Sequence, residues 1–238
     1  MSTVYALTLR QLTSKWRLVI MAILAALPVL IAFAMVGESN GSPTVREFET
    51  AVLGAMLAGS IAPLVVLAIS APAFANELED RTLANLSLAP MPRWQIVVPK
   101  LLAAITLSAP FVVASALATS YVAYLGDLRA MTAVTVGALS GVALYSSAFV
   151  WLGLVTTQAI GIGLLYIVLW EGFFAGFVAG ARLLSIRYMA VGIMHAIDPR
   201  RFAWASHPAA TVSALIALLV FAAFLWLAIR RLRRMDIP

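Results

Sequence analysis

Six long apolar stretches constrain the fold of this chain more than any other feature. Each has about the 20 residues that an α-helix needs to cross the hydrocarbon core of a bilayer. They run over residues 18–36, 51–74, 101–125, 131–155, 159–180 and 209–229. We therefore expect an all-α integral membrane protein with six transmembrane helices, folded as a single transmembrane domain over residues 1–238.

The composition excludes the main alternatives to a membrane protein. Hydrophobic residues make up 63% of the chain and charged residues 11%, against about 25% charged residues in an average soluble domain. A soluble globular protein, a disordered chain and a nucleic-acid-binding domain are excluded, because none can hide so much apolar surface. The first stretch, which follows Lys15 and Arg17, also resembles a cleaved signal peptide, but we expect a retained span.

Basic residues predict the orientation of the spans. Cytoplasmic segments are enriched in Lys and Arg, and four arginines within residues 230–234 directly follow the last stretch. With both termini in the cytoplasm, the inner segments hold ten of the 16 Lys and Arg residues. We therefore expect both termini inside, and we attribute the net charge of +6 to this bias and to anionic lipid, with no nucleic acid as partner.

Two segments outside the spans have apolar character of their own. In residues 2–17, one helical face carries apolar side chains, which predicts an interfacial helix on the inner leaflet; a plain solvated tail is the alternative. Residues 181–208 contain an apolar run, from Tyr188 to Ile197, that is too short to span. We expect a re-entrant-like outer segment there. The face of the first segment consists of Tyr5, Leu9, Leu12 and Trp16.

Small residues recur within two of the spans and predict close helix contacts. Gly137 and Gly141 are four residues apart in the fourth stretch, and Gly172, Gly176 and Gly180 repeat this spacing in the fifth. Glycine lets two helix backbones approach closely. We expect these positions to pack against neighbouring helices.

The sequence contains no recognisable catalytic centre. It has no Cys, and its only histidines, His195 and His207, lie outside the expected spans. Thiolate chemistry, the His-Glu-x-x-His motif and an intramembrane Ser–His pair are therefore excluded. The Gly-Lys-Ser/Thr sequence of a P-loop is absent as well. We expect no catalytic residue, no cofactor and no metal site in this chain.

The longest inner connection, residues 76–92, is the most informative segment. It begins with Glu77 and Glu79, as a helix N-terminus favours, and continues with a short apolar patch at Leu83 and Leu86 before two prolines. Such an amphipathic helix is suited to bind in a groove of a soluble partner. A lipid-facing interfacial loop is the alternative.

This connection resembles the permease subunits of type-2 ABC exporters. Two positions depart from the family pattern without changing its spacing, because Arg81 and Pro99 stand where Gly is common. The resemblance extends to the interfacial helix, the six spans and the re-entrant-like segment. The matching residues are Glu77, Glu79, Thr82, Leu83, Pro90, Arg93 and Lys100.

The resemblance implies how such a chain would work. Two permeases, identical or homologous, form a translocation path in the bilayer, and each binds a separate ABC ATPase subunit that carries ATP and Mg²⁺. A prokaryotic plasma (inner) membrane is implied. A membrane scaffold or sensor without transport, and a stand-alone channel or secondary carrier, remain alternatives. The residues implied in coupling to the ATPase are Glu77, Glu79, Arg81, Thr82, Leu83, Leu86 and Arg93.

Glu171 is the one charged residue within the six expected spans. A carboxylate in hydrocarbon costs several kcal/mol, so it is expected to face protein or a wet cavity. Together with Trp170, it is a candidate for the translocation path or a gate. The alternative is a structural hydrogen bond to a neighbouring span, and the sequence leaves both open.

Overall fold

Every regular element in the described part of the chain is a helix. The computed structural model describes residues 2–37, 45–80, 92–177, 179–202 and 210–234. Five helical runs are long and apolar enough to cross a membrane, which confirms the expected all-helical membrane protein. These runs are Lys15–Val36, Val45–Glu79, Trp94–Tyr124, Leu128–Val155 and Thr211–Arg234.

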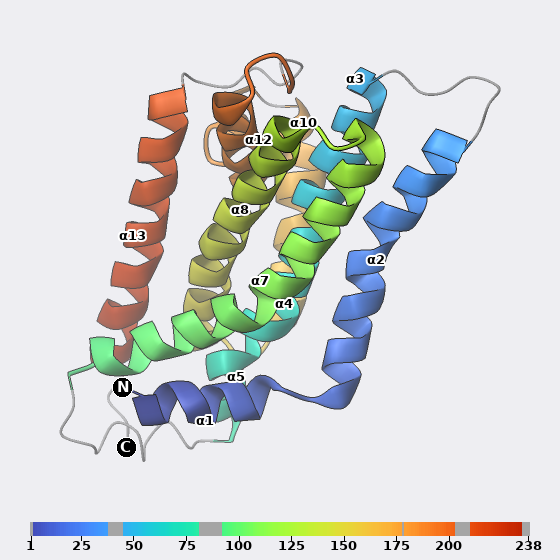
Figure 1. The fold of residues 1–238 in the computed structure, drawn as a ribbon. Helices are drawn as coiled ribbons and strands as arrows, with labels where there is room; N and C mark the ends of the chain where they lie inside the picture. The colour runs from blue at the N-terminus through green and yellow to red at the C-terminus, as the bar shows by residue number, and fades with distance from the viewer. Residues whose placement is uncertain (1, 38–44, 81–91, 178, 203–209, 235–238) are drawn as a thin grey trace.

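The first two helices meet at one end of the bundle. α1 (Ser2–Leu12) lies across this end, which we call the α1 end, and α2 (Lys15–Gly37) leads away from it (Figure 1). α1 packs against α7, and Leu12 is fully buried. Trp16 does not share this face, because the helix is interrupted before Lys15 and the Trp16 side chain is 78% exposed on α2.

The second span is one continuous helical run that is more deeply buried than the other four. It passes through the whole bundle, from the end opposite α1 back to the α1 end (Figure 1). Part of it is π-helical, a rare conformation that is frequent at functional sites. Its consecutive elements are α3 (Val45–Phe48), the π-helical η1 (Glu49–Ile61), α4 (Ala62–Ser70) and α5 (Pro72–Glu79).

The next two spans form the centre of the bundle. The first turns of α7 (Trp94–Tyr124) run across the α1 end before the helix turns along the bundle (Figure 1). Pro99 and Pro110 lie within α7, and proline is the usual cause of such kinks. α8 (Leu128–Val155) packs against α4, α7, α12 and α13.

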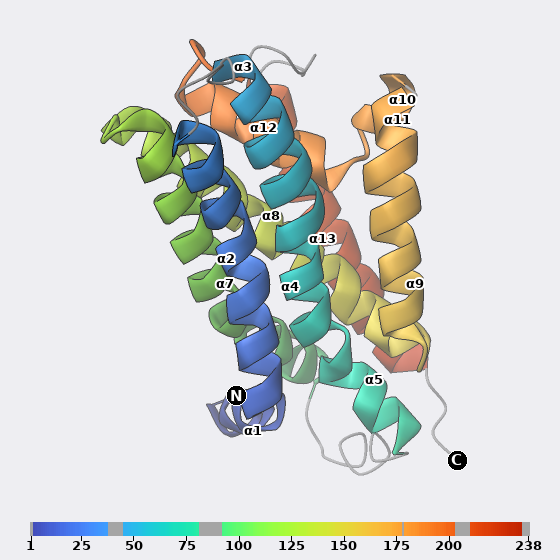
Figure 2. The ribbon, with the colours of Figure 1, turned by 90° about the vertical axis from the view of Figure 1, so that its right-hand side faces the viewer.

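The fifth expected span is assembled from short pieces at the edge of the bundle. The apolar helix Ala159–Phe174 is shorter than the five long runs. Figure 2 places this segment on one side of the bundle and α2 and α7 on the other. The pieces are α9 (Ala159–Leu165), the π-helical η2 (Tyr166–Phe174), α10 (Ala175–Phe177) and α11 (Ala179–Arg182).

α12 marks the opposite end of the bundle, and the last helix, α13, leads back from it. α12 (Ile186–Ile197) lies at this α12 end, within the expected outer segment, and α13 (Ala210–Arg234) returns to the α1 end (Figure 1). The start of α1 and the end of α13 therefore share one end, as both termini on one side of a membrane require. That this side is cytoplasmic stays a prediction.

The glycine positions differ in how closely they pack. A Cβ atom at Gly137 would lie 2.9 Å from the backbone oxygen of Ala190 on α12, which confirms the close backbone approach expected there. The expectation is wrong for Gly172 and Gly180 within the described chain. The nearest atom to a Cβ at Gly172 belongs to its own helical run, and nothing lies within 4 Å of one at Gly180. Their span lies at the bundle edge, where it has few neighbours.

A substitution at Gly153 tests the packing of the second and fourth spans. A Cβ there would lie 2.3 Å from the backbone oxygen of Ala71, so Gly153→Ala forces the two backbones apart. We expect a loss of about 1–3 kcal/mol of stability, measured by thermal unfolding in detergent. Gly161→Ala is the control, because no atom lies within 4 Å of its Cβ position. Equal stability of the two variants would contradict this packing.

Candidate functional site

A buried ion pair joins the second and third spans at the α1 end. Nζ of Lys100 on α7 lies 2.5 Å from Oε1 of Glu77 on α5, and the Lys100 side chain is only 1% exposed. The same ammonium group donates a hydrogen bond of 2.6 Å to the backbone oxygen of Ala73. It also lies 4.2 Å from the centre of the Phe74 ring. Lys100 therefore makes all these contacts with a single helix, α5.

This arrangement fixes α5 against α7 directly before residues 81–91. Removing one partner of a buried ion pair leaves an uncompensated charge in a medium of low polarity, so such pairs resist separation. Glu79, two residues further on, is exposed. Arg93, at the start of α7, is half-buried. The structure thus places Glu77, but not Glu79, in the ion pair.

The rest of the expected coupling segment lies outside the described residues. This applies to Arg81, Thr82, Leu83 and Leu86. Lys100, by contrast, matches the family pattern but is not among the residues expected in coupling, and the structure places it in the ion pair. The available signal was a lysine just before a long apolar stretch, where a charge needs a partner.

Glu171 is fully buried in η2 and is held by the start of α12. Oε1 accepts hydrogen bonds of 3.0 Å from the Tyr166 hydroxyl and of 3.0 Å from the backbone N–H of Ile186. Oε2 accepts a hydrogen bond from the Ser185 hydroxyl. The carboxylate therefore faces protein, as its cost in hydrocarbon requires.

These contacts make Glu171 a capping group for α12. Ser185 is the N-cap residue of α12, and its Oγ accepts a hydrogen bond from the backbone N–H of Tyr188. The first N–H groups of a helix lack intrahelical acceptors and favour a negative charge. Glu171 supplies both an acceptor and, when ionised, that charge from another span. The carboxylate thereby connects the fifth span to α12.

Arg187 adds a second connection between the same elements. It donates a hydrogen bond from NH1 to the backbone oxygen of Glu171, at 3.5 Å. Its Cδ lies only 2.9 Å from where a Cβ would be at Gly59 on η1, so it passes through space that only glycine leaves open. α12 is thus held where η1 and η2 meet.

Trp170 lies in a different environment from its neighbour. It lines an apolar cavity of about 440 Å³ between η2, α12 and α13. The Tyr166 ring lines the same cavity, while the Tyr166 hydroxyl binds Glu171. Trp170 and Glu171 are adjacent in the chain, but only Trp170 lines this cavity, and Tyr166 contributes to both environments. The remaining lining residues are Leu184, Ile186, Val220, Ala223, Phe224 and Leu227.

Among the described residues, neither the surroundings of the Lys100–Glu77 pair nor those of Glu171 have the ligand set of a metal centre. In the part of the chain that the structure describes, no group of three or more His, Asp or Glu residues could hold a metal ion. The two regions instead contain buried charges whose partners are protein groups. Their arrangement can join helices and transmit movement between them.

The Lys100–Glu77 pair predicts a strong coupling between two substitutions. Glu77→Gln or Lys100→Met alone leaves one buried charge without its partner, and each is expected to cost about 3–5 kcal/mol. Glu77→Gln combined with Lys100→Met should cost clearly less than the sum of the two. Unfolding in detergent measures all three variants, with exposed Glu79→Gln as a control that changes little. Strictly additive losses would show that the pair does not act as a unit.

Comparison with known protein families shows which family this chain resembles. A family model described as an ABC-2 family transporter protein matches residues 9–194. The matched region begins in α1 and ends in α12, so it contains the Lys100–Glu77 pair and Glu171 with its partners at the start of α12. No curated protein matches the chain.

Proposed function

Since the chain belongs to the ABC-2 transporter family, we propose that it is the permease subunit of an ATP-driven exporter. In this proposal, two permeases, identical or homologous, form the translocation path. A separate ABC ATPase subunit binds each of them and supplies ATP and Mg²⁺. The absence of a P-loop sequence from this chain supports the division of labour.

The Lys100–Glu77 ion pair is the observation that carries the proposal. It fixes α5, which precedes residues 81–91, to α7, which follows them and begins directly after Arg93. A force that an ATPase exerts on a helix containing Arg81, Thr82 and Leu83 would therefore move the second and third spans together. ATP binding would draw two ATPase subunits together, and residues 76–92 would transmit that motion.

The other end of the second span suggests how the motion would reach a gate. The run Val45–Glu79 is continuous, and its η1 part contacts both η2 and α12. Movement of α5 would therefore act on the elements that Glu171 holds together. In this proposal, Glu171 positions α12 as an outer gate, and Trp170 lines the adjoining apolar space.

The location of the protein follows from the same proposal. The arginine cluster at the end of α13 lies at the α1 end, together with α5 and the start of α7. Basic residues favour the cytoplasmic side, which is also where an ATPase would bind. We place the protein in the plasma (inner) membrane of a prokaryote, with both termini in the cytoplasm.

Purification from the native membrane in mild detergent tests the central claim. Mass spectrometry should identify a stoichiometric P-loop ATPase that co-elutes with the chain, and substrate should stimulate its turnover. A folded protein without an ATPase would favour a stand-alone carrier or channel. An ATPase whose turnover no substrate stimulates would favour a scaffold or sensor.

Two leucines in the inner connection provide a sharper test. Leu83→Asp combined with Leu86→Asp should abolish ATPase binding, because charged groups do not fit an apolar groove. Co-purification and ATPase activity of the reconstituted complex are the measurements. Leu125→Asp, at a residue that is 88% exposed beyond α7, makes the same chemical change at the α12 end and should leave binding intact. Full binding and coupled activity in the Leu83/Leu86 variant would refute the coupling role.

Substitution of Glu171 is expected to impair transport without impairing assembly. Glu171→Gln keeps the shape of the side chain but replaces an accepting oxygen with an NH₂ donor that faces the donors at the start of α12, so transport or its substrate range should be impaired while the ATPase still binds. Ser185→Ala removes one donor from the same site and should act in the same direction. Transport by reconstituted vesicles is the measurement. Unchanged transport of every substrate tested would leave Glu171 a structural role only.

A further inference from the structure

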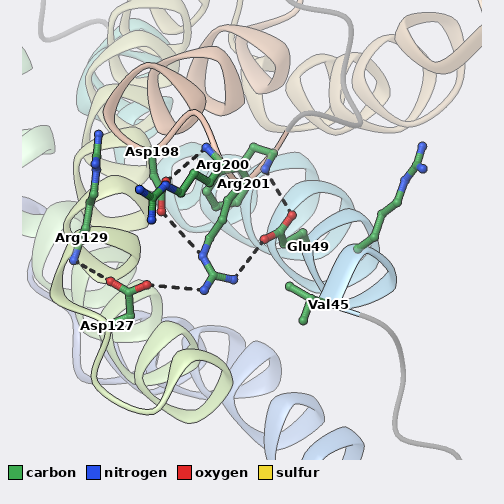
Figure 3. A pocket seen from close by; sticks show the side chains of 9 residues that line it. Val45, Glu49, Asp127, Arg129, Asp198, Arg200 and Arg201 are labelled. Carbon is green, nitrogen blue, oxygen red and sulfur yellow. Dashed lines mark hydrogen bonds and ion pairs between the residues drawn. The ribbon is translucent and has the colours of Figure 1, made fainter.

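A charged pocket of about 590 Å³ opens at the α12 end (Figure 3). Its walls come from three parts of the chain that are far apart in sequence. The start of the second span supplies Val45, Arg46 and Glu49, the start of α8 supplies Asp127 and Arg129, and the segment after α12 supplies Asp198, Arg200, Arg201 and Phe202. Four basic and three acidic side chains therefore line one cavity.

Arg201 stands at the centre of the three carboxylates (Figure 3). Its guanidinium nitrogens lie 3.6 Å from Glu49 Oε1, 3.4 Å from Asp127 Oδ2 and 3.6 Å from Asp198 Oδ2. The Arg201 guanidinium also lies 4.1 Å from the centre of the Tyr124 ring. One arginine thus engages all three acids.

The remaining carboxylate oxygens are engaged by N–H groups. Glu49 Oε2 accepts from the backbone N–H of Phe202, and Asp198 Oδ1 accepts from that of Arg200. Asp127 Oδ1 accepts from the backbone N–H groups of Ala130 and Arg129. The hydrogen bond from Ala130 is the main cause that lowers the pKa of Asp127, and the Arg129 N–H and the Arg201 guanidinium act in the same direction. These acids therefore have little capacity left for a cation.

Three arginines of the pocket have no such engagement. Among the described residues, no carboxylate lies within 4.0 Å of the guanidinium groups of Arg46, Arg129 and Arg200, and all three side chains are exposed. Arg129 is held in place, because its Nε donates a 3.0 Å hydrogen bond to the backbone oxygen of Ile197. That bond leaves the terminal nitrogens of Arg129 available.

Charge and size together define the ligand class. With the acids engaged by Arg201, the positive groups left over are guanidinium groups, which bind phosphate oxygens with two parallel hydrogen bonds. The volume lies within the roughly 300–1,000 Å³ of typical ligand pockets and exceeds what a bare phosphate ion fills. The pocket lies where the second, third and fourth spans end, and we expect lipid phosphates near the ends of spans, because the hydrocarbon core is about as thick as a span is long.

We propose that this pocket binds a phosphate-bearing anion through Arg129 and Arg200, with Arg46 also lining the site. The ligand would join α8 to the segment after α12. Two sources have this chemistry: the phosphate of a lipid headgroup and free phosphate. The proposal is independent of the ATPase and of transport, and it can be tested on the purified chain alone.

Binding to the full chain in a non-ionic detergent tests the proposal. The probes are dioctanoyl-phosphatidylglycerol, dioctanoylglycerol, which lacks the phosphate, and inorganic phosphate, each followed by native mass spectrometry and by the rise in Tm. We expect saturable binding of the phosphatidylglycerol and none of the dioctanoylglycerol. Phosphatidylglycerol alone would identify a lipid as the source, and saturable binding of inorganic phosphate as well would identify free phosphate.

The variants decide whether the arginines are responsible. Arg200→Gln removes a guanidinium that makes no side-chain contact among the described residues, so the fold should survive while binding becomes at least about tenfold weaker. Arg129→Gln combined with Arg200→Gln should abolish binding. Arg231→Gln combined with Arg233→Gln makes the same charge change on exposed positions of α13 at the other end and should leave binding unchanged.

Three results would overturn the proposal. The first is that neither phosphate-bearing probe binds the wild-type chain. The second is unchanged binding in both the single and the double pocket variants. The third is an equal loss in the α13 variant, which would show general attraction between a basic protein and an anion instead of a site.

Discussion

The structure depends on one constraint: a charged group inside a membrane protein must find its partner within the protein. Hydrocarbon offers no hydrogen bonds, so an unpaired carboxylate or ammonium there is costly. The described chain buries four charged residues, Lys100, Glu171, Glu49 and Asp198. Asp198 is engaged by the nearby Arg200 and Arg201, whereas Lys100, Glu171 and Glu49, at 1%, 0% and 5% exposure, are each held by groups from a different segment of the chain. These three residues mark the points where helices are joined.

The second span connects these points. Near one end of the run Val45–Glu79, Glu49 accepts hydrogen bonds from Tyr124 and Phe202, and near the other end Glu77 pairs with Lys100. Between them the run is almost wholly apolar and tightly packed, for example where Ala71 meets Gly153. A rigid, buried helix with a polar attachment at both ends can carry a displacement across the membrane. This property suits a permease that an ATPase drives from one side.

The two π-helical segments, η1 and η2, coincide with two of the buried acids. η1 begins at Glu49, η2 contains Glu171, and the two segments contact each other. A π-helix shifts the side chains that follow it relative to an α-helix, and such segments are frequent at functional sites. Here they meet next to α12, where Arg187 passes Gly59 to reach the backbone of Glu171. α12 is therefore positioned by hydrogen bonds to η2 and by close packing against η1.

Much of the architecture could be predicted from local sequence patterns. The length and apolarity of each stretch are properties of consecutive residues, so the helices and their approximate bounds followed from hydropathy and from the bilayer thickness. The fifth span was harder to predict, because hydropathy does not separate one long helix from short α and π pieces. The interruption before Trp16 was missed for a similar reason, since helical spacing alone does not show where a helix breaks.

The sequence by itself determined that this chain is a helical membrane protein, that it lacks a P-loop, and that Glu171 needs a partner inside the protein. Only the tertiary structure decided which partners the buried charges have. Lys100 and Glu77 are 23 positions apart, Glu171 and Ser185 are 14 apart, and Glu49 and Phe202 are 153 apart. Such pairs form only when helices have packed. The cost of an unpaired charge is fixed by chemistry, but the group that relieves it is chosen by the fold.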